Sequence, residues 1–306
     1  MTNSPKIYHQ IKEIQQELLP NRATKTIALV PTMGNLHEGH LELVKLAKAR
    51  ADIVVVSIFV NPTQFGVGED FDSYPRTLDE DVAKLAGVGA DVVFAPSIDE
   101  MYPVMPPPTQ VLSGDIAKLL CGKSRPTHFD GVGIVVCKLF NIIAPNIAIF
   151  GQKDYQQLAI IKQIVRDLSY PIEIIAAPII RADDGLALSS RNQYLTADER
   201  KIAPKLQQEL QKLAEQLKDL ALKTDSLQKP LTELIEVSKN NLNQAGFLVD
   251  YLEIKSPMLA PITSENAAAV FQNESALVIL VAAKLGRARL LDNLVVENWL
   301  LKNHKP

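Results

Sequence analysis

Two histidines three residues apart, His37 and His40, lie in the segment PTMGNLHEGH immediately after an apolar run. An imidazole ring can coordinate a metal, bond to a carbonyl inside a core, or donate a hydrogen bond to a phosphate. Gly34 precedes the pair and Gly39 lies between the two histidines, and both glycines allow the backbone to approach a ligand closely. If a helix begins near Leu36, its first N–H groups also favour an anion. We therefore expect the histidines to bind phosphate, with a core role as the alternative.

A zinc site is a third interpretation of the same segment. The zinc protease signature has its histidines four residues apart with a glutamate beside the first, whereas the spacing here is three. The remaining histidines, His9, His128 and His304, are scattered along the chain. We expect no catalytic zinc held by protein ligands.

A lysine and an aspartate follow a second apolar run, in FGQKDYQQ at residues 150–157. Gly151 allows close approach to a flat ligand, and Lys153 can place a positive charge on a phosphate. Asp154 can accept hydrogen bonds from hydroxyls such as those of a ribose. The alternative is an ordinary helix start, with Asp154 as its cap and Lys153 solvated.

Two other segments carry polar side chains between apolar runs. Ser189, Ser190 and Arg191 supply two hydroxyls and a forked cation, which suits the leaving phosphates of a nucleotide. Asn61 and Gln64, in NPTQFG, offer neutral amides that can orient the carboxylate or hydroxyl of a small substrate. A polar interdomain loop and an Asn-Pro turn, respectively, are the alternatives.

Composition limits the classes of partner. The chain has 306 residues and a formal net charge of only -3, so no basic field attracts nucleic acid or an anionic membrane. Cys121 and Cys137 are too few for a disulfide framework. The first residues lack the apolar stretch of a signal peptide, and no apolar run is long enough to span a membrane. We expect a cytoplasmic protein whose phosphate recognition is local.

The elements that would position these side chains alternate along the chain. Strands are expected at 26–31, 53–60, 91–94, 147–150 and 172–176, and helices at 38–50, 78–87, 133–144 and 154–168. Strands that are apolar on both faces belong in parallel sheets covered by helices. This pattern predicts an α/β fold with a doubly wound parallel sheet and ligands at the carboxyl ends of its strands.

The composition of the sequence and its pattern of apolar residues change past about residue 181. A helical stretch at 196–243, rich in Lys, Gln and Leu, precedes the strand-like segments DYLEI and ALVILVAAKLG. We therefore expect two domains, at 1–181 and 182–306, of which the second is a smaller α+β domain.

The motifs resemble those of a known family when they are taken together and in order. PTMGNLHEGH, SIFVNPTQFG, DFDSYPRT, HFDGV, FGQKDYQQL, GLALSSRN and ARLLDN are similar to the ordered motifs of the pantoate and β-alanine ligases, a family of the HxGH nucleotidyltransferase superfamily. The similarity spans essentially the whole chain. It implies a Rossmann-like first domain that binds ATP and pantoate. Because the second domain carries the Ser-Ser-Arg loop beyond a hinge near Arg181, we also expect it to close over the nucleotide as a lid.

The resemblance also implies a role for individual residues. ATP contacts fall on Met33, Gly34, Asn35, Leu36, His37, Glu38, Gly39, His40, Gly151, Gln152, Lys153, Asp154, Ile180, Leu188, Ser189, Ser190 and Arg191. His40, His37, Lys153 and Arg191 are the expected catalytic residues, and Gln64, Gln157 and Asn61 are expected to bind pantoate. Asn35 stands where the family usually has alanine, and Leu188 where methionine is common.

The implied reaction has two steps. The pantoate carboxylate attacks the α-phosphate of ATP to give a pantoyl adenylate and pyrophosphate, and the amine of β-alanine then displaces AMP. Mg²⁺ is expected with ATP, without named protein ligands, because the acidic run Asp79, Glu80 and Asp81 is typical of a helix cap and a solvated face. The resemblance implies a homodimer formed through the N-terminal domain.

Two other functions are compatible with parts of the sequence. A cytidylyltransferase-like enzyme would use the same HxGH motif but retain the nucleotide in its product. A catalytically silent module would bind ATP without turnover. Gln64, Gln157 and the GQKD segment favour the ligase over the cytidylyltransferase.

Overall fold

The computed structural model describes residues 4–221, 228–262 and 276–297 of the chain. These residues form two compact units, each with its own hydrophobic packing: residues 1–152 with 156–180, and residues 153–155 with 181–306. The prediction that residues 1–181 and 182–306 are two separate domains, each able to fold by itself, stays a prediction.

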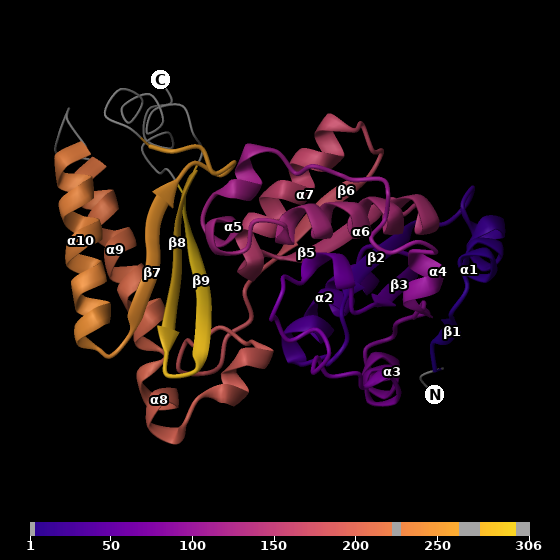
Figure 1. The fold of residues 1–306 in the computed structure, drawn as a ribbon, viewed down its shortest axis with the longest axis horizontal. Coiled ribbons are helices and arrows are strands. Elements are labelled where there is room, and N and C mark those ends of the chain that lie inside the picture. The colour runs from indigo at the N-terminus through magenta and orange to yellow at the C-terminus, as the bar shows by residue number, and fades with distance from the viewer. Residues whose placement is uncertain (1–3, 222–227, 263–275, 298–306) are drawn as a thin grey trace. The chain divides into compact units, whose positions relative to one another are not determined.

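The first unit is built on a six-stranded parallel sheet (Figure 1). Its strands are β1 (Lys6–Tyr8), β2 (Ile27–Thr32), β3 (Ile53–Ile58), β4 (Val92–Phe94), β5 (Ile147–Gly151) and β6 (Glu173–Ala177), in the order β1-β4-β3-β2-β5-β6. The side chains of successive strand residues point to opposite faces, and in β3 both sets are buried. Such strands need helices on both sides of the sheet.

Helices cover both faces of this sheet (Figure 1). They are α1 (Ile11–Leu18), α2 (Glu38–Lys48), α3 (Leu78–Gly87), α4 (Ile98–Met101), α5 (Cys121–Ser124), α6 (His128–Ile143) and α7 (Tyr155–Asp167). Apolar side chains of α1, α6 and α7 pack with Leu29 and Val55 on one face. Those of α2 and α3 pack with Val30 and Val56 on the other face.

The strand order changes direction between β2 and β5. Along the sheet, β3 and β4 follow β2 on one side, whereas β6 follows β5 on the other. β2 and β5 are parallel neighbours, with Ala28 opposite Ile147. Ligands of doubly wound sheets bind outside the carboxyl ends of the strands at this switch. The segments that leave β2 and β5 here begin with Met33 and Gln152.

The second unit has a three-stranded antiparallel sheet, β7 (Leu248–Lys255), β8 (Ala276–Leu285) and β9 (Ala288–Glu297), in that order. Its helices are α8 (Ala197–Ile202), α9 (Lys205–Ala221) and α10 (Gln228–Gln244). Leucines of α9 at helical spacing, including Leu206, Leu210 and Leu213, pack into one core with the strands. The sheet therefore has a helical cover built from local apolar periodicity.

The fold class expected from the sequence is confirmed: a doubly wound parallel sheet and a smaller α+β unit. β1 and β9 were not expected as strands, because β1 is only a short edge strand and β9 contains three charged residues. Helix α6 starts at His128, five residues before the expected start, although Gly131 and Gly133 lower its helix propensity. The helical stretch expected at 196–243 comprises α8, α9 and α10, and its residues 222–227 lie outside the described residues.

A helix that spans a membrane needs about 20 consecutive, predominantly apolar residues. Along the described residues, no helix is both long and apolar enough to cross a membrane.

Candidate functional site

The two histidines of HEGH cap helix α2. His37 is the N-cap residue, and its Nδ1 accepts a hydrogen bond from the Gly39 N–H at 3.1 Å. The Nδ1 of His40 accepts from the His37 N–H at 3.3 Å, and the ring centroids are 4.1 Å apart. A neutral imidazole whose Nδ1 accepts must carry its hydrogen on Nε2. Each ring therefore carries its hydrogen on Nε2, at the start of a helix that favours anions.

A buried carboxylate holds the loop that leads to these histidines. The expectation of a solvated acidic face fits Asp79 and Glu80, which are exposed, but is wrong for Asp81, which is 0% exposed. Asp81 lies on the face of α3 turned toward this loop. Its carboxylate accepts from the Asn35 N–H at 2.9 Å and the Leu36 N–H at 2.7 Å.

The loop has an unusual backbone that these contacts stabilise. Gly34 and Asn35 both have positive φ, +81° and +51°, which costs energy for a residue with a side chain. A Cβ at Gly34 would lie 3.1 Å from Asp81 Oδ2. The Nζ of Lys84 donates to the Leu36 carbonyl at 2.8 Å. Two side chains one helical turn apart on α3 thus fix the entry to α2.

Replacing Asp81 with asparagine should therefore impair the site. The amide can accept from only one of the two loop N–H groups, and its NH₂ then faces the other. We expect the free energy of unfolding to fall by about 2 kcal/mol, and ATP-dependent turnover to fall by about a hundredfold if the loop moves by an ångström. Urea unfolding and steady-state kinetics measure the two effects. Asp79→Asn, at an exposed position of the same helix, is the control, and equal kinetics in both variants would contradict the role of Asp81.

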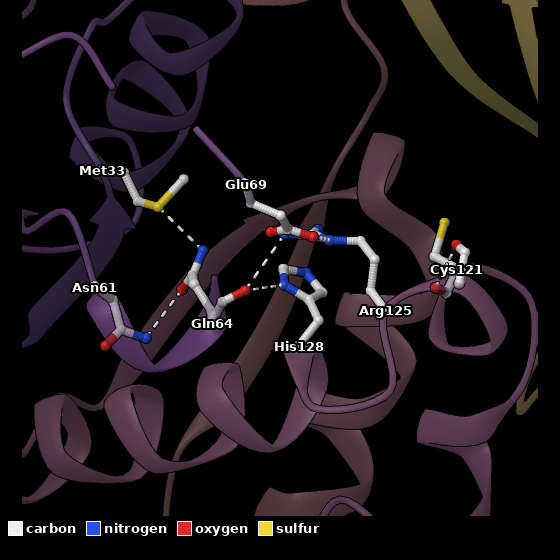
Figure 2. Close-up of polar contacts among 8 residues, drawn as sticks. Met33, Asn61, Gln64, Glu69, Cys121, Arg125 and His128 are labelled. Carbon is white, nitrogen blue, oxygen red and sulfur yellow. Dashed lines mark hydrogen bonds and ion pairs between the residues drawn. The ribbon is translucent and has the colours of Figure 1, made fainter. Parts of the chain in front are cut away.

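Gln64 links the loop after β3 to the loop after β2 (Figure 2). It ends the short 3-10 helix η2 (Pro62–Gln64) and is 8% exposed. Its Nε2 donates to the sulfur of Met33 at 3.0 Å, and its Oε1 accepts from Asn61 Nδ2 at 3.0 Å. The structure therefore brings a proposed pantoate ligand and the first residue of the proposed ATP loop into contact.

Asn61 is 1% exposed, and protein groups engage both ends of its amide. Besides Gln64, its Nδ2 donates to the Gly131 carbonyl at 3.0 Å, and its Oδ1 accepts from the Tyr102 hydroxyl at 3.0 Å. Burial raises the pKa of Tyr102 to about 12, so this phenol stays a donor at neutral pH. These contacts suit Asn61 to holding Gln64 in place. A direct contact of Asn61 with substrate stays a prediction.

Helix α6 approaches η2 closely at Gly131, the glycine of HFDGV. A Cβ there would lie 2.1 Å from the Thr63 carbonyl oxygen. We expect Gly131→Ala to lower the free energy of unfolding by about 3 kcal/mol, because backbone must move. Gly87→Ala, at the end of α3 where a Cβ meets nothing within 4 Å, should leave stability unchanged or raise it by up to about 1 kcal/mol. Thermal unfolding compares the two, and equal midpoints would contradict the packing argument.

The backbone carbonyl of Gln64 is held from α6 and the turn before it (Figure 2). Nδ1 of His128 contacts this oxygen at 2.8 Å and Nη2 of Arg125 at 3.3 Å, so His128 carries a hydrogen on Nδ1. Arg125 also forms a bidentate pair with Glu69, at 2.7 and 2.5 Å. The pair connects the loop after Gln64 to the turn between α5 and α6.

This pair makes stability depend on acidity. The Arg125 hydrogen bonds hold the pKa of Glu69 below its ordinary value of 4.5. The pair therefore stabilises the fold above pH 4.5, and this contribution is lost as the pH falls through the lower folded pKa. Glu69→Gln should cost on the order of 1 kcal/mol at pH 7, as expected for a partly exposed pair. Unfolding at a series of pH values tests this, because the difference from the wild type should shrink in acid. A constant difference would contradict it.

Residues after β5 divide between the two units. Gly151 and Gln152 end the first part of the first unit, at the switch between β2 and β5. Gln156 is buried and bonds to the Cys121 N–H and to the carbonyls of Ile116 and Leu119, whereas Gln157 is half-buried. Gln156 is therefore structural, and Gln157 is the glutamine of this pair that is open to a ligand.

The second unit carries the lysine and the serine-arginine segment. The Lys153 side chain is 19% exposed, with Nζ 3.6 Å from Asp154 Oδ1. Ser189 caps the short helix η5 (Ser190–Tyr194), because its hydroxyl accepts from the Arg191 N–H at 3.2 Å. Arg191 itself is exposed. Ser189 thus caps a helix through its hydroxyl oxygen, which leaves its hydroxyl hydrogen as a donor.

The structure therefore groups the expected site residues in two sets. The first unit holds Met33–His40, Asn61, Gln64, Gly151, Gln152, Gln157 and Ile180, and the second holds Lys153, Asp154 and Leu188–Arg191. Sequence reasoning missed the residues that position the first set: Asp81, Lys84, Arg125, His128 and Gly131. His128 and Gly131 lie in the motif HFDGV, which the sequence analysis singled out. No local sequence pattern indicated that Asp81 is buried.

A protein-bound metal site needs several ligating side chains held close together. Within the described ranges, no group of three or more His, Cys, Asp or Glu side chains is placed to hold a metal ion. Both oxygens of the Asp81 carboxylate already accept hydrogen bonds. The donor set around α2 is instead made of N–H groups, which suit phosphate oxygens.

Comparisons with known proteins agree across the chain. The family model described as pantoate-beta-alanine ligase matches residues 6–295. A pantothenate synthetase of Psychrobacter arcticus is 68% identical, covering 95% of this chain and 98% of the relative. The Acinetobacter baylyi pantothenate synthetase is 54% identical, covering 94% and 97%.

Solved structures are similar over the same range. The pantothenate synthetase of Thermus thermophilus is 40% identical with a TM-score of 0.82, covering 95% of this chain and 99% of that one. The pantoate-beta-alanine ligase of Francisella tularensis, complexed with beta-gamma ATP and beta-alanine, is 35% identical with a TM-score of 0.73, covering 95% and 97%.

Proposed function

The chain belongs to the pantoate-beta-alanine ligase family and joins pantoate to β-alanine with ATP, and we propose that the two sets of residues described above carry out this reaction. A pantoate carboxylate oxygen attacks the α-phosphorus of ATP, the bond to the bridging oxygen breaks, and pyrophosphate leaves. The amine of β-alanine then attacks the acyl carbon, loses a proton, and releases AMP.

The contact between Gln64 and Met33 is the observation that carries this assignment. A carboxylate held by Gln64 would lie next to the loop that is proposed to bind the ATP phosphates. Gln157, on α7 of the same unit, is our second proposed pantoate ligand. Holding both reactants in one geometry is a large source of rate enhancement in such transfers.

Charge stabilisation comes from donors, because no enzyme nucleophile is needed. His37 and His40 would donate through Nε2 to the phosphates, and Gly151, Gln152 and Asp154 would contact the nucleoside. Lys153 and Arg191 would add positive charge as pyrophosphate leaves. Ser189 and Ser190 would donate hydrogen bonds, and Ile180 and Leu188 would line the nucleotide.

Mg²⁺ is expected to enter with ATP. When bound, the ion offsets phosphate charge, and phosphates and water commonly supply most of its ligands. The donor set on α2 fits a phosphate group whose charge is partly neutralised in this way. Activity should therefore be lost in a chelator and restored by added Mg²⁺.

Product analysis tests the proposed reaction. With ATP, pantoate and β-alanine, the expected products are AMP, pyrophosphate and the amide in equal amounts. A nucleotide-bearing product formed from CTP, with no AMP, would overturn the proposal in favour of a cytidylyltransferase. ATP binding without any product would indicate a silent module.

Three finer expectations go beyond the family assignment. We propose that the chain is a homodimer, that it is cytoplasmic, and that its second unit closes over bound nucleotide as a lid. Light scattering gives the oligomeric state. X-ray scattering with and without ATP and pantoate should show compaction on binding, and identical curves would contradict the lid.

A further inference from the structure

The segment Lys153–Tyr155 packs with the second unit, although it lies in the chain between two elements of the first. Asn293, on β9, donates from Nδ2 to the Lys153 carbonyl at 3.0 Å. The Tyr155 hydroxyl donates to the Pro257 carbonyl at 3.2 Å. Because Asn293 is 1% exposed, water does not compete for its contact. The backbone that carries Lys153 is therefore fixed from β9.

The residue before Asn293 holds the other proposed phosphate-binding segment. Asp292 is 4% exposed and pairs with both terminal nitrogens of Arg181, at 2.7 and 2.8 Å. Arg181 also donates to the Gly185 carbonyl at 3.0 Å, inside a turn closed by a β-bridge between Arg181 and Ala187. This turn leads directly into Leu188 and Ser189.

A buried ion pair and a buried amide at adjacent strand positions are expensive unless each is satisfied. Here Asn293 is paired with the carbonyl of Lys153, and Asp292 is paired with Arg181 at the start of the turn that leads to Leu188. The ARLLDN motif of β9 thus reaches both Lys153 and the segment Leu188–Arg191 within one unit.

We infer that Asp292 and Asn293 are positioning residues that hold Lys153 and the segment Ser189–Arg191 in one fixed arrangement within the second unit. This inference rests on the proposed phosphate contacts of Lys153 and Arg191. Asn293 acts through the backbone of Lys153, and Asp292 acts through the side chain of Arg181. Neither residue touches substrate. Their loss therefore acts on the step in which pyrophosphate leaves, and pantoate binding by Gln64 and Gln157 is unaffected.

The test is a double-mutant cycle, read out as pantoate-dependent exchange of labelled pyrophosphate into ATP. We expect Asn293→Ala to lower kcat for exchange by about tenfold or more with an unchanged KM for pantoate. In a Lys153→Met background, the same change should lower kcat by less than about twofold, because coupled residues are not additive. Asn293→Ser retains a donor and should recover part of the rate.

Asp250→Asn is the matched control, since Asp250 pairs with Arg289 at 2.6 Å on the same sheet without contacting either segment. It should leave exchange unchanged. If Asn293→Ala does not fold, the corresponding cycle of Asp292→Asn with Arg191→Met gives the answer, because Asp292 holds the turn that leads to Arg191. If Asn293→Ala lowers kcat equally in the wild-type and Lys153→Met backgrounds, and Lys153→Met itself is defective, this inference alone is overturned. Normal exchange by Lys153→Met would overturn the proposed role of Lys153 and this inference with it.

Discussion

Replacing His40 with alanine should lower the rate of pantoate-dependent pyrophosphate exchange by about a hundredfold or more. The change removes one Nε2–H donor at the start of α2 and the acceptor for the His37 N–H. Loss of one cap contact costs about 1 kcal/mol, which the fold should withstand. Exchange kinetics and thermal melting measure the two effects. Near-normal exchange with unchanged melting would contradict the assignment.

Two further substitutions of His40 distinguish the role of its Nε2 from that of its Nδ1. Glutamine places an amide N–H near the position of Nε2, whereas asparagine places its polar atoms near Nδ1. If donation from Nε2 stabilises the phosphates, His40→Gln should retain more activity than His40→Asn. The opposite order would indicate that His40 acts mainly by fixing His37 through its Nδ1.

Replacing Lys153 with methionine should also suppress exchange by about a hundredfold or more. Methionine retains an unbranched side chain of similar length but removes the charge that would meet the leaving phosphates. The Lys153 side chain is mostly buried, so the charge acts where water screens it least. Kinetics of exchange at saturating pantoate give the effect on kcat.

Lys162→Met is the matched control for this change. Lys162 is an exposed lysine of α7, in the helix that follows Lys153. It should retain full exchange activity. An equal loss of exchange in the two variants would mean that the net charge of the protein, and not a local contact of Lys153, determines the rate. Full activity of Lys153→Met would show that Lys153 has no role in the mechanism.

The first unit was predictable from the sequence for a physical reason. Strands buried on both faces, such as β3, are apolar at nearly every position, and the helices between them repeat with a different period. The switch between β2 and β5 then determines which loops meet, so the sequence could place PTMGNLHEGH and FGQKDYQQ at the ends of strands. The edge strand β1 was not predicted, because its three residues show no such pattern.

The supporting residues were not predictable in the same way. Asp81 belongs to an acidic run at a helix start, where exposure is the usual outcome, and only the packing of α3 against the loop after β2 buries it. Asp292 and Asn293 break the apolar pattern of β9 for a similar reason, since their partners are distant in sequence. A local sequence pattern shows which face of a helix or strand is buried. It does not show which distant residue will pair with a polar side chain on that face.

Pantoate-dependent exchange of labelled pyrophosphate into ATP, with Mg²⁺ present and β-alanine omitted, tests the central claim most directly. We expect exchange that requires pantoate and that falls together in His40→Ala and Lys153→Met. This result would establish reversible adenylate formation that depends on residues of both sets. Absence of exchange, in an enzyme that still releases AMP once β-alanine is added, would contradict a free adenylate and require a concerted ligation.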